Sequence, residues 1–280
     1  MDGLGFRQTA ENVTLDVFDE IIRRSGDESG LTRVLRVMSR RVRKRAAMEM
    51  MRSQTQEPWM RRLLECQEEI VRSGAIPYYL NRYRGQEISF WMNVPKWIYE
   101  SSTRTRVVRC LDIGCAYGTL ALFCKRLFDC EVFCLDKVTS EGILALTRKN
   151  GMSFAKSDVE LDPFPWNLEF DLIIFTEVIE HLNFNPVPTL RRIRDHLAHD
   201  GRLYLSTPDA AHWGRVKGSC LSWKDIPYPD RGLPLKGGHI YQYGKDELCR
   251  VTDDAGLDVE MFDYAPGFGA RHLNFCLRRK

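Results

Sequence analysis

The segment VVRCLDIGCAYG, residues 107–118, decides the fold. It begins with an apolar run that is typical of a buried strand and ends in a turn that contains Gly114 and Gly118. The helix-forming stretch GTLALFCKRLF, residues 118–128, follows directly. A strand, a glycine turn and a helix in this order indicate a βαβ unit, in which helices join parallel strands.

The same alternation continues to the end of the chain. Further strands are expected at 130–136, 152–158, 170–175, 201–207, 258–264 and 271–278. Further helices are expected at 139–150, 188–198 and 245–256. This pattern predicts an α/β fold with a Rossmann-like, doubly wound, mostly parallel sheet of seven strands. Ligands of such sheets bind beyond the carboxyl ends of the strands.

The composition is that of an ordinary globular chain. Its 280 residues are 44% hydrophobic and 28% charged, which argues against a disordered, collagen-like or repeat protein. No apolar run reaches the roughly 18 residues of a membrane span, and the N-terminus lacks a signal-peptide pattern, so we expect a cytoplasmic protein. Nine cysteines without paired C-x-x-C spacing predict reduced core thiols rather than disulfides or a zinc site.

Charge and aromatic content divide the chain into a predicted helical N-terminal extension or cap, residues 1–104, and a predicted catalytic domain, residues 105–280. Residues 31–52 carry eight Lys/Arg and one Glu on an amphipathic helical pattern. This basic helix would contact anionic lipid headgroups, RNA phosphates or a phosphorylated acceptor, or else pack against the acidic residues 1–30. The aromatic stretch 75–101 forms either core or a pocket wall. Helices are expected in the second half of the extension, with breaks at Pro58, Gly74, Pro77, Gly85 and Pro95.

An acidic residue stands at the end of each of the first three predicted strands: Asp112, Asp136 and Asp158. The G-x-G-x-x-G fingerprint and the phosphate-binding P-loop are both absent, so a pyrophosphate cradle is not expected. A carboxylate at a strand end can accept hydrogen bonds from two ribose hydroxyls or from an exocyclic amine. Three such acids and a glycine turn therefore indicate a cationic nucleoside without phosphates, such as S-adenosylmethionine.

Five segments support this interpretation by their order and spacing: LDIGCAYG, CLD, SDVE, FDLIIFTEVIEHL and LRRIRDHLAHDGRLYLSTPD. Together they resemble the class I S-adenosylmethionine-dependent methyltransferases, over about residues 105–280. The resemblance implies a transferase of EC 2.1.1 type and a sheet whose last strand is antiparallel. Two departures are mild: Ala116 stands where the family usually has its middle glycine, and Asp200-Gly201 replaces Pro-Gly-Gly.

The resemblance also assigns cofactor contacts by position. It places the methionine part beside the glycine turn and Asp112, the ribose at Asp136, and the adenine at Asp158 and Val159. The predicted cofactor-binding residues are Asp112, Gly114, Cys115, Gly118, Asp136, Lys137, Asp158, Val159, Thr176 and Glu177.

The segment TEVIEH, residues 176–181, follows the predicted fourth strand and supplies a second set of functional groups. Glu177, Glu180 and His181 are spaced i, i+3 and i+4, so on one helical turn they would share a face. With His239 they form a candidate site for Mg²⁺ or Mn²⁺, which would hold an acceptor hydroxyl and lower its pKa. Without metal, His181 and Glu180 are the candidate catalytic residues, with His181 as general base. In a further interpretation, Glu177 touches the cofactor and His181 only packs beneath the loop.

The E-x-x-E-H segment and the later pattern His239, Tyr243, Glu247 and Leu248 resemble two methyltransferase groups. One acts on quinone precursors, sugars and glycans, and the other methylates the 2′-oxygen at the 3′ end of small RNA with the help of a metal. We therefore predict an O-methyltransferase for a hydroxyl of a small or glycan-type acceptor, which the basic helix would suit if it were phosphorylated or lipid-linked. The alternatives are the RNA 3′-end enzyme and a non-catalytic cofactor-binding protein.

Overall fold

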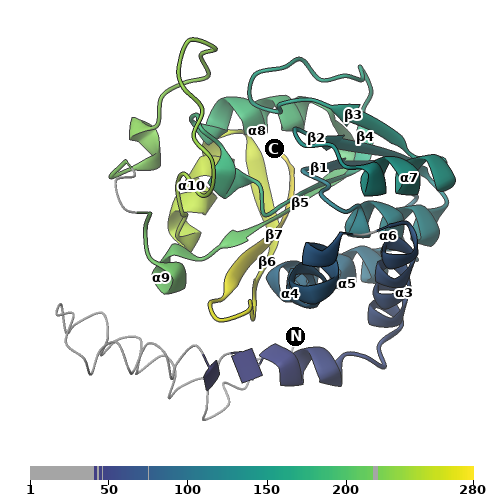
Figure 1. Ribbon diagram of the computed structural model, residues 1–280. Helices are drawn as coiled ribbons and strands as arrows, with labels where there is room; N and C mark the ends of the chain where they lie inside the picture. Colours follow the sequence, from purple (N-terminus) through teal and green to yellow (C-terminus); the bar gives the residue numbers. More distant parts are fainter. Residues whose placement is uncertain (1–40, 43, 46, 75, 217–219) are drawn as a thin grey trace, which may run out of the picture.

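The computed structural model describes residues 41–280 except 43, 46, 75 and 217–219 (Figure 1). The acidic segment 1–30 and the first part of the basic segment 31–52 lie outside the described residues, so the hypotheses on their contacts stay predictions. The described positions between 41 and 53 are helical. Within the described residues, every helix is too short or too polar to cross a membrane.

A seven-stranded sheet forms the centre of the molecule, in the order β3-β2-β1-β4-β5-β7-β6. Strands β1 to β5 pair in parallel, whereas β7 runs antiparallel to both β5 and β6. The predicted doubly wound fold with an antiparallel last strand is confirmed. The strands are β1 (Arg109–Ile113), β2 (Glu131–Asp136), β3 (Ser153–Lys156), β4 (Phe170–Thr176), β5 (Leu197–Pro208), β6 (Leu257–Ala265) and β7 (His272–Arg279).

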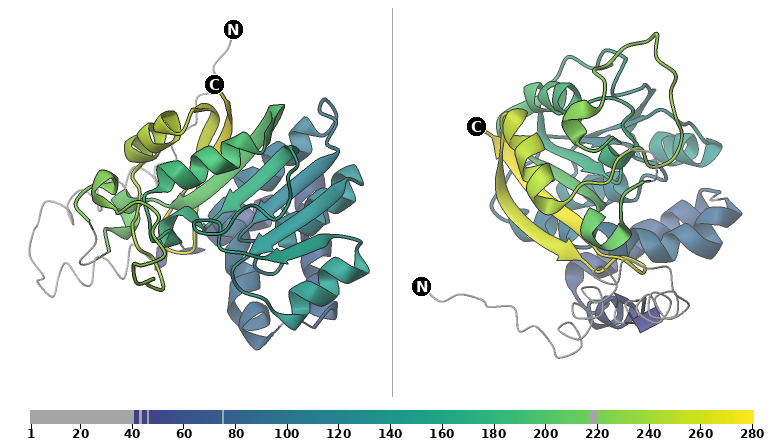
Figure 2. Two further views of the ribbon diagram at one scale, coloured as in Figure 1. Left: turned by 90° about the horizontal axis from the view of Figure 1, so that it is seen from above. Right: turned by 90° about the vertical axis from the view of Figure 1, so that its left-hand side faces the viewer.

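Helices cover both faces of the sheet, and β6 with β7, yellow in Figure 2, closes one edge. The helices are α3 (Pro58–Arg72), α4 (Arg84–Trp91), α5 (Asn93–Ser101), α6 (Thr119–Phe128), α7 (Glu141–Lys149), α8 (Pro186–Asp195), α9 (Ala210–Trp213) and α10 (Lys245–Asp254). Shorter turns are the π-helical η1 (Tyr79–Tyr83) and the 3₁₀ turns η2 (Ile179–His181) and η3 (Trp223–Asp225).

Two of the helix breaks expected in the N-terminal part are wrong. Gly85 is the second residue of α4, and Pro95 is the third residue of α5. Proline is tolerated there because the first-turn N–H groups have no partner inside the helix. The division of the chain at residue 104 stays a prediction.

Alternating strand residues supply two hydrophobic cores, one on each face. Cys110 of β1 joins the core beneath α3 to α7, whereas its neighbour Leu111 joins the core beneath α8 and α10. Trp59 and Ile98, from the N-terminal helices, are buried in the first core together with Phe123 of α6. The N-terminal helices therefore pack on the same side of the sheet as the helix that follows the glycine turn.

The glycine turn after β1 packs directly against the chain after β4. Gly114 has φ 72°, and a Cβ at this position would lie 2.3 Å from Cγ2 of Val178. Val178 is β-branched, so its side chain has little rotational freedom with which to yield. Glycine at 114 therefore meets two requirements, a left-handed backbone and a close contact.

Gly114→Ala should lower the free energy of unfolding by about 3 kcal/mol, because the methyl group overpacks this contact. Gly151→Ala is the matched control, since Gly151 has φ 60° and a Cβ there would have no atom within 4 Å. In Gly151→Ala, the left-handed backbone at an alanine should by itself lower the free energy of unfolding by about 1 kcal/mol. Urea unfolding of both variants measures the difference, and equal losses would contradict the importance of the Val178 contact.

Candidate active site

The carboxyl ends of the parallel strands meet at one edge of the sheet (Figure 1). Because β7 is antiparallel, it begins at this same edge, where His272 pairs with Pro208 at the end of β5. The loops after β1, β2, β4 and β5 and the start of β7 therefore converge there. Almost all of the residues predicted from the sequence for cofactor or metal lie on these segments.

Asp136, at the end of β2, ties two loops together. Its carboxylate accepts hydrogen bonds from the backbone N–H of Ala116 at 2.9 Å and of Val138 at 2.8 Å. Ala116 has φ 47°, which explains why glycine suits this position. Each carboxylate oxygen of Asp136 keeps a further lone pair for a ligand hydroxyl.

Asp112 and Glu87 place two buried carboxyl groups near the glycine turn. Asp112 accepts from the backbone N–H of Ala121 at 3.1 Å, and burial followed by the charge of Asp136 raises its pKa to about 7. Glu87 comes from α4, and burial raises its pKa to about 7 as well. Neither forms an ion pair with any Lys or Arg among the described residues. This acidic surrounding suits a positively charged ligand group.

Glu87 was not predicted from the sequence, because nothing in its neighbourhood marks it. It accepts hydrogen bonds from Gln67 Nε2 at 2.7 Å, the Tyr79 hydroxyl at 3.0 Å and Thr119 Oγ1 at 3.0 Å. Thr119 is the first residue of α6, directly after the glycine turn. The N-terminal helices are therefore bonded to the turn by a polar network as well as by packing.

Tyrosines from η1 lie over the same turn. The ring of Tyr117 lies 4.5 Å from that of Tyr79 and 5.4 Å from that of Tyr83, centroid to centroid. π-Helical turns are rare and are frequently found at functional sites. The aromatic stretch that the sequence left open between core and pocket is largely core, since Tyr79 and Trp91 are buried in it, and Tyr83 packs on Tyr117 beside the turn after β1.

The other predicted cofactor residues also lie along this edge. Asp158 accepts from the backbone N–H of Glu160 at 2.8 Å, and Val159 beside it is buried. Lys137 is exposed next to Asp136, whereas Cys115 is buried in the glycine turn. The edge thus offers three strand-end carboxylates and glycine-turn backbone, a donor and acceptor set that fits a cationic nucleoside without phosphates.

Glu177 departs from the predicted geometry. Its φ is 56°, and it precedes the 3₁₀ turn η2, so the expectation that it shares a helical face with Glu180 and His181 is wrong. The left-handed backbone of Glu177 instead directs its carboxylate toward β5 and β7. It accepts from Ser206 Oγ at 2.8 Å and from Nδ1 of His272 at 3.0 Å.

Glu180, His181 and His239 do come together, with one potential metal-ligand atom from each lying within 4.8 Å of the others. Glu177 is not part of this group. Nδ1 of His181 lies 2.8 Å from the carbonyl oxygen of Gly238, so Nδ1 donates and Nε2 is left with its lone pair. Nε2 lies 3.9 Å from Oε1 of Glu180.

Burial shifts the pKa values of Glu180 and His239 in opposite directions. Burial, followed by the charge of Glu177, raises the pKa of Glu180 well above its ordinary value, although Thr207 Oγ1 donates to its carboxylate at 3.0 Å. Burial, followed by the neighbouring His181, lowers the pKa of His239. A neutral His239 has a lone pair on one ring nitrogen, and this lone pair can bind a cation or accept a proton from a hydroxyl group.

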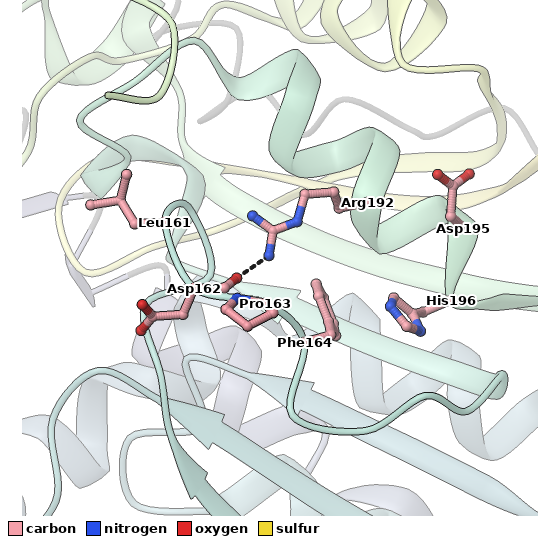
Figure 3. A pocket seen from close by; sticks show the side chains of 7 residues that line it. All are labelled: Leu161, Asp162, Pro163, Phe164, Arg192, Asp195 and His196. Carbon is pink, nitrogen blue, oxygen red and sulfur yellow. Dashed lines mark hydrogen bonds between the residues drawn. The ribbon is translucent and has the colours of Figure 1, made fainter. Parts of the chain in front are cut away.

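Two surface hollows lie outside the Glu180, His181 and His239 cluster. Figure 3 shows one under α8, where Arg192 donates to the backbone oxygen of Asp162. It extends from Asp162, whose carboxylate accepts from the backbone N–H of Asp158 at 2.8 Å, to His196, just before the amino end of β5. It is lined by Leu161, Asp162, Pro163, Phe164, Arg192, Asp195 and His196. The second hollow lies on the basic helix and is lined by Arg41, Lys44, Arg45, Met48, Glu49 and Arg52.

Comparison with known proteins identifies the family. Residues 51–261, well over half of the chain, match the family described as "Methyltransferase domain". The chain belongs to this methyltransferase family. The prediction of a class I S-adenosylmethionine-dependent methyltransferase is therefore confirmed, and the enzyme is of the EC 2.1.1 type. No curated protein matches the sequence.

Solved structures share the fold of this methyltransferase at low sequence identity. An S-adenosylmethionine-dependent methyltransferase from Clostridium acetobutylicum ATCC 824 is 12% identical, with a TM-score of 0.53, and the match covers 72% of this chain and 96% of that one. The 1,6-didemethyltoxoflavin-N1-methyltransferase of Burkholderia thailandensis is 18% identical, with a TM-score of 0.53 and coverage of 76% and 88%. An O-methyltransferase from a trans-AT PKS multienzyme of Brevibacillus brevis is 15% identical, with a TM-score of 0.51 and coverage of 73% and 81%.

Glu87→Gln should change how the stability of the methyltransferase depends on pH. The folded pKa of Glu87 is about 7, above its ordinary value, so the folded chain binds this proton more tightly than the unfolded chain. Glu87 therefore stabilises the fold least at high pH, and wild-type stability should fall between about pH 5 and about pH 8. Relative to wild type, the variant should gain up to about 3 kcal/mol over this interval.

Urea unfolding at both pH values measures this change. Glu100→Gln on α5 is the control, because Glu100 is exposed and should show no such gain. If the stability of Glu87→Gln changes with pH as that of wild type does, protonation of Glu87 does not contribute to the pH dependence of stability.

Proposed function

We propose that this methyltransferase is an O-methyltransferase that acts on a hydroxyl group of a small or glycan-type acceptor. The observation that supports this most is the Glu180, His181 and His239 cluster at the carboxyl end of β4. Carboxylate and imidazole groups can orient a hydroxyl and promote loss of its proton, which an oxygen acceptor requires. The fold does not choose between oxygen and nitrogen, since one similar structure is an O-methyltransferase and another an N1-methyltransferase.

S-adenosylmethionine is the cofactor, and the strand-end acids are proposed to hold it. In this proposal Asp136 accepts the ribose hydroxyls, Asp158 with Val159 flanks the adenine, and Asp112 with the glycine turn surrounds the methionine part. Asp112 and Asp136 would surround the positive charge with carboxylates. The remaining proposed contacts are Gly114, Cys115, Gly118, Lys137, Thr176 and Glu177.

The cofactor supplies a methyl group that is already activated by its bond to a positively charged sulfur. The protein then has two tasks, to orient the acceptor oxygen in line with the methyl carbon and to remove the hydroxyl proton. The Glu180 cluster lies only three residues beyond Glu177, at the end of β4, and so adjoins the proposed cofactor contacts. This position suits both tasks.

We further propose that the cluster holds a divalent cation, Mg²⁺ or Mn²⁺. His181 donates Nδ1–H to Gly238, the kind of bond that fixes a metal-ligating imidazole. The Gln242 amide lies 3.2 Å from Nδ1 of His239, and its Oε1 is buried without a partner among the described residues. If the Gln242 amide is rotated by 180°, its Oε1 accepts a hydrogen bond from Nδ1–H of His239. The lone pair of Nε2 of His239 is then free to bind the cation. Without a cation, His181 would be the base.

The basic helix supports an anionic acceptor. Lys44 Nζ lies 4.5 Å from the centre of the Phe268 ring, in the turn between β6 and β7 at the edge that carries the site. A phosphate group on a sugar or lipid-linked acceptor would match this charge. An RNA acceptor would use the same helix and is an alternative that the acceptor panel below tests. Contact with a membrane surface is a further alternative for this helix.

Asp136→Asn should weaken binding of S-adenosylhomocysteine, which lacks only the transferred methyl group, by at least about tenfold. The amide removes the charge and one acceptor oxygen from the proposed ribose contact. Asp129→Asn, at the exposed end of α6, is the matched control and should bind as wild type. Isothermal titration measures both, and unchanged affinity of Asp136→Asn would contradict the ribose assignment.

Methyl transfer from S-adenosylmethionine should occur to hydroxyl probes, and Glu180→Gln should reduce it by about 10²-fold or more. The probes are catechol, methyl α-glucoside, glucose 6-phosphate and an RNA oligonucleotide with a 3′-terminal hydroxyl, and histamine is the amine control. Release of S-adenosylhomocysteine is measured with added Mn²⁺ and with EDTA.

Activity that EDTA abolishes supports the cation, whereas full activity in EDTA contradicts it. Activity on RNA alone, falling steeply with salt, would favour the RNA alternative. Transfer to histamine alone would contradict O-methylation. His199→Asn, a fully exposed site on β5, is the control for loss of a polar side chain.

A further inference from the structure

A second imidazole lies at the same edge, outside the Glu180 cluster. His272, the first residue of β7, is 1% exposed, and its Nδ1 lies 3.0 Å from the Glu177 carboxylate. An ionised carboxylate only accepts hydrogen bonds, so Nδ1 carries the hydrogen and Nε2 keeps its lone pair in the neutral ring. Nε2 is buried and has no hydrogen-bond partner among the described residues.

The surroundings hold this ring in place. Phe90 of α4 stacks on it with ring centroids 4.5 Å apart and an interplanar angle of 17°. Ser206 Oγ donates to the same carboxylate at 2.8 Å. Glu177 keeps a left-handed backbone, with φ 56°, to present that carboxylate. Such backbone conformations persist only where the neighbouring structure enforces them, and they cluster at active sites.

The charged and titratable groups near the ring are few. Glu177 faces it from the end of β4, and His239 lies beyond Trp213, whose ring is 5.9 Å from that of His272 and 5.8 Å from that of His239. The adjacent Arg271 is paired with Asp209 at 2.5 Å. Glu177 is thus the one charged group in direct contact with His272 among the described residues.

We propose that His272 is a catalytic residue, the base that takes the acceptor's hydroxyl proton at Nε2, and that Glu177 is its positioning residue. The proposal rests on the proposed O-methyl transfer. The acceptor oxygen forms a bond to the methyl carbon while the bond from that carbon to sulfur breaks, and the sulfur keeps the electron pair as a neutral thioether. The O–H proton passes to Nε2, and Glu177 stabilises the resulting imidazolium.

His272, rather than His181, is assigned as the base because of the hydrogen-bond partner of His181. Nδ1 of His181 is bonded to Gly238, and with a cation in the cluster its Nε2 is a ligand, so no nitrogen of His181 is left to accept a proton. The cation would lower the pKa of the hydroxyl, and His272 would receive the proton. Trp213 is 45% exposed and contacts both rings, so the acceptor reaches Nε2 where this indole now packs.

The first test needs no acceptor. Nitrogen NMR of the ¹⁵N-histidine-labelled full chain with S-adenosylhomocysteine bound should show the neutral ring of His272 as the tautomer with hydrogen on Nδ1. His272→Asn identifies the signals. A neutral ring that carries its hydrogen on Nε2 overturns the proposal.

The second test measures methyl transfer to whichever hydroxyl probe of the panel wild type methylates fastest. His272→Asn keeps a donor near the Nδ1 position for Glu177 but lacks Nε2, so its rate should fall at least about 10²-fold. His272→Ala should regain activity with added imidazole, which a purely structural role would not produce. His196→Asn is the matched control, because His196 also stacks on a phenylalanine and bonds through Nδ1, far from the site.

The outcomes separate this proposal from the proposed function. Wild-type transfer to a hydroxyl with an unimpaired His272→Asn variant overturns the role of His272 alone. Loss of activity in His272→Asn and recovery of His272→Ala by imidazole, with His196→Asn unchanged, supports it. Loss in both variants without imidazole rescue also overturns it. Failure of wild type to bind S-adenosylhomocysteine overturns the proposed function itself.

Discussion

The close packing of Gly114 against Val178 is the contact on which the site depends. It joins the turn after β1 to the chain after β4, and a Cβ at Gly114 would come within 2.3 Å of the valine methyl group. Of the proposed cofactor contacts, Gly114, Cys115 and Gly118 lie on one side of this junction, and the Glu180 cluster lies on the other. Methyl transfer requires donor and acceptor to be in line and almost in contact, so a wider junction would separate the two groups.

The N-terminal helices are part of the same arrangement. They bury Trp59 and Ile98 against the sheet and place the Glu87 carboxyl on Thr119, at the start of α6. Phe90, three residues after Glu87 on α4, stacks on His272. The short helix α4 thus contacts the residue after the glycine turn through Glu87 and the proposed catalytic histidine through Phe90. A shift of α4 would therefore move both parts of the site.

Two acid–imidazole sets flank Trp213, and their environments differ. Glu180 is buried with a raised pKa and faces His181, a geometry suited to a cation that displaces the carboxyl proton. Glu177 accepts from Ser206 and His272, a geometry suited to holding one imidazole in a single tautomer. Low dielectric strengthens the bond between His272 and Glu177, since both side chains are largely buried away from water, whereas His181 is partly exposed. The residue that divides them is left-handed Glu177, which directs its carboxylate away from the Glu180 cluster.

The sequence by itself determined the fold and marked most of the residues that we propose as cofactor contacts. Apolar runs alternating with helical stretches depend only on local periodicity, and Asp112, Asp136 and Asp158 are each marked by their place at a strand end. Seven of the nine cysteines are buried thiols, whereas Cys220 and Cys249 are half-buried. The tertiary structure alone decided which acids and histidines meet. Spacing placed Glu177 with Glu180 and His181, but a left-handed φ, which depends on the packing around it, turned it to β7. His272 and Glu87 carry no local signal. The Glu177 partner of His272 lies 95 residues away, and the Thr119 partner of Glu87 lies 32 residues away. They meet only when the antiparallel last strand and the N-terminal helices pack on the sheet.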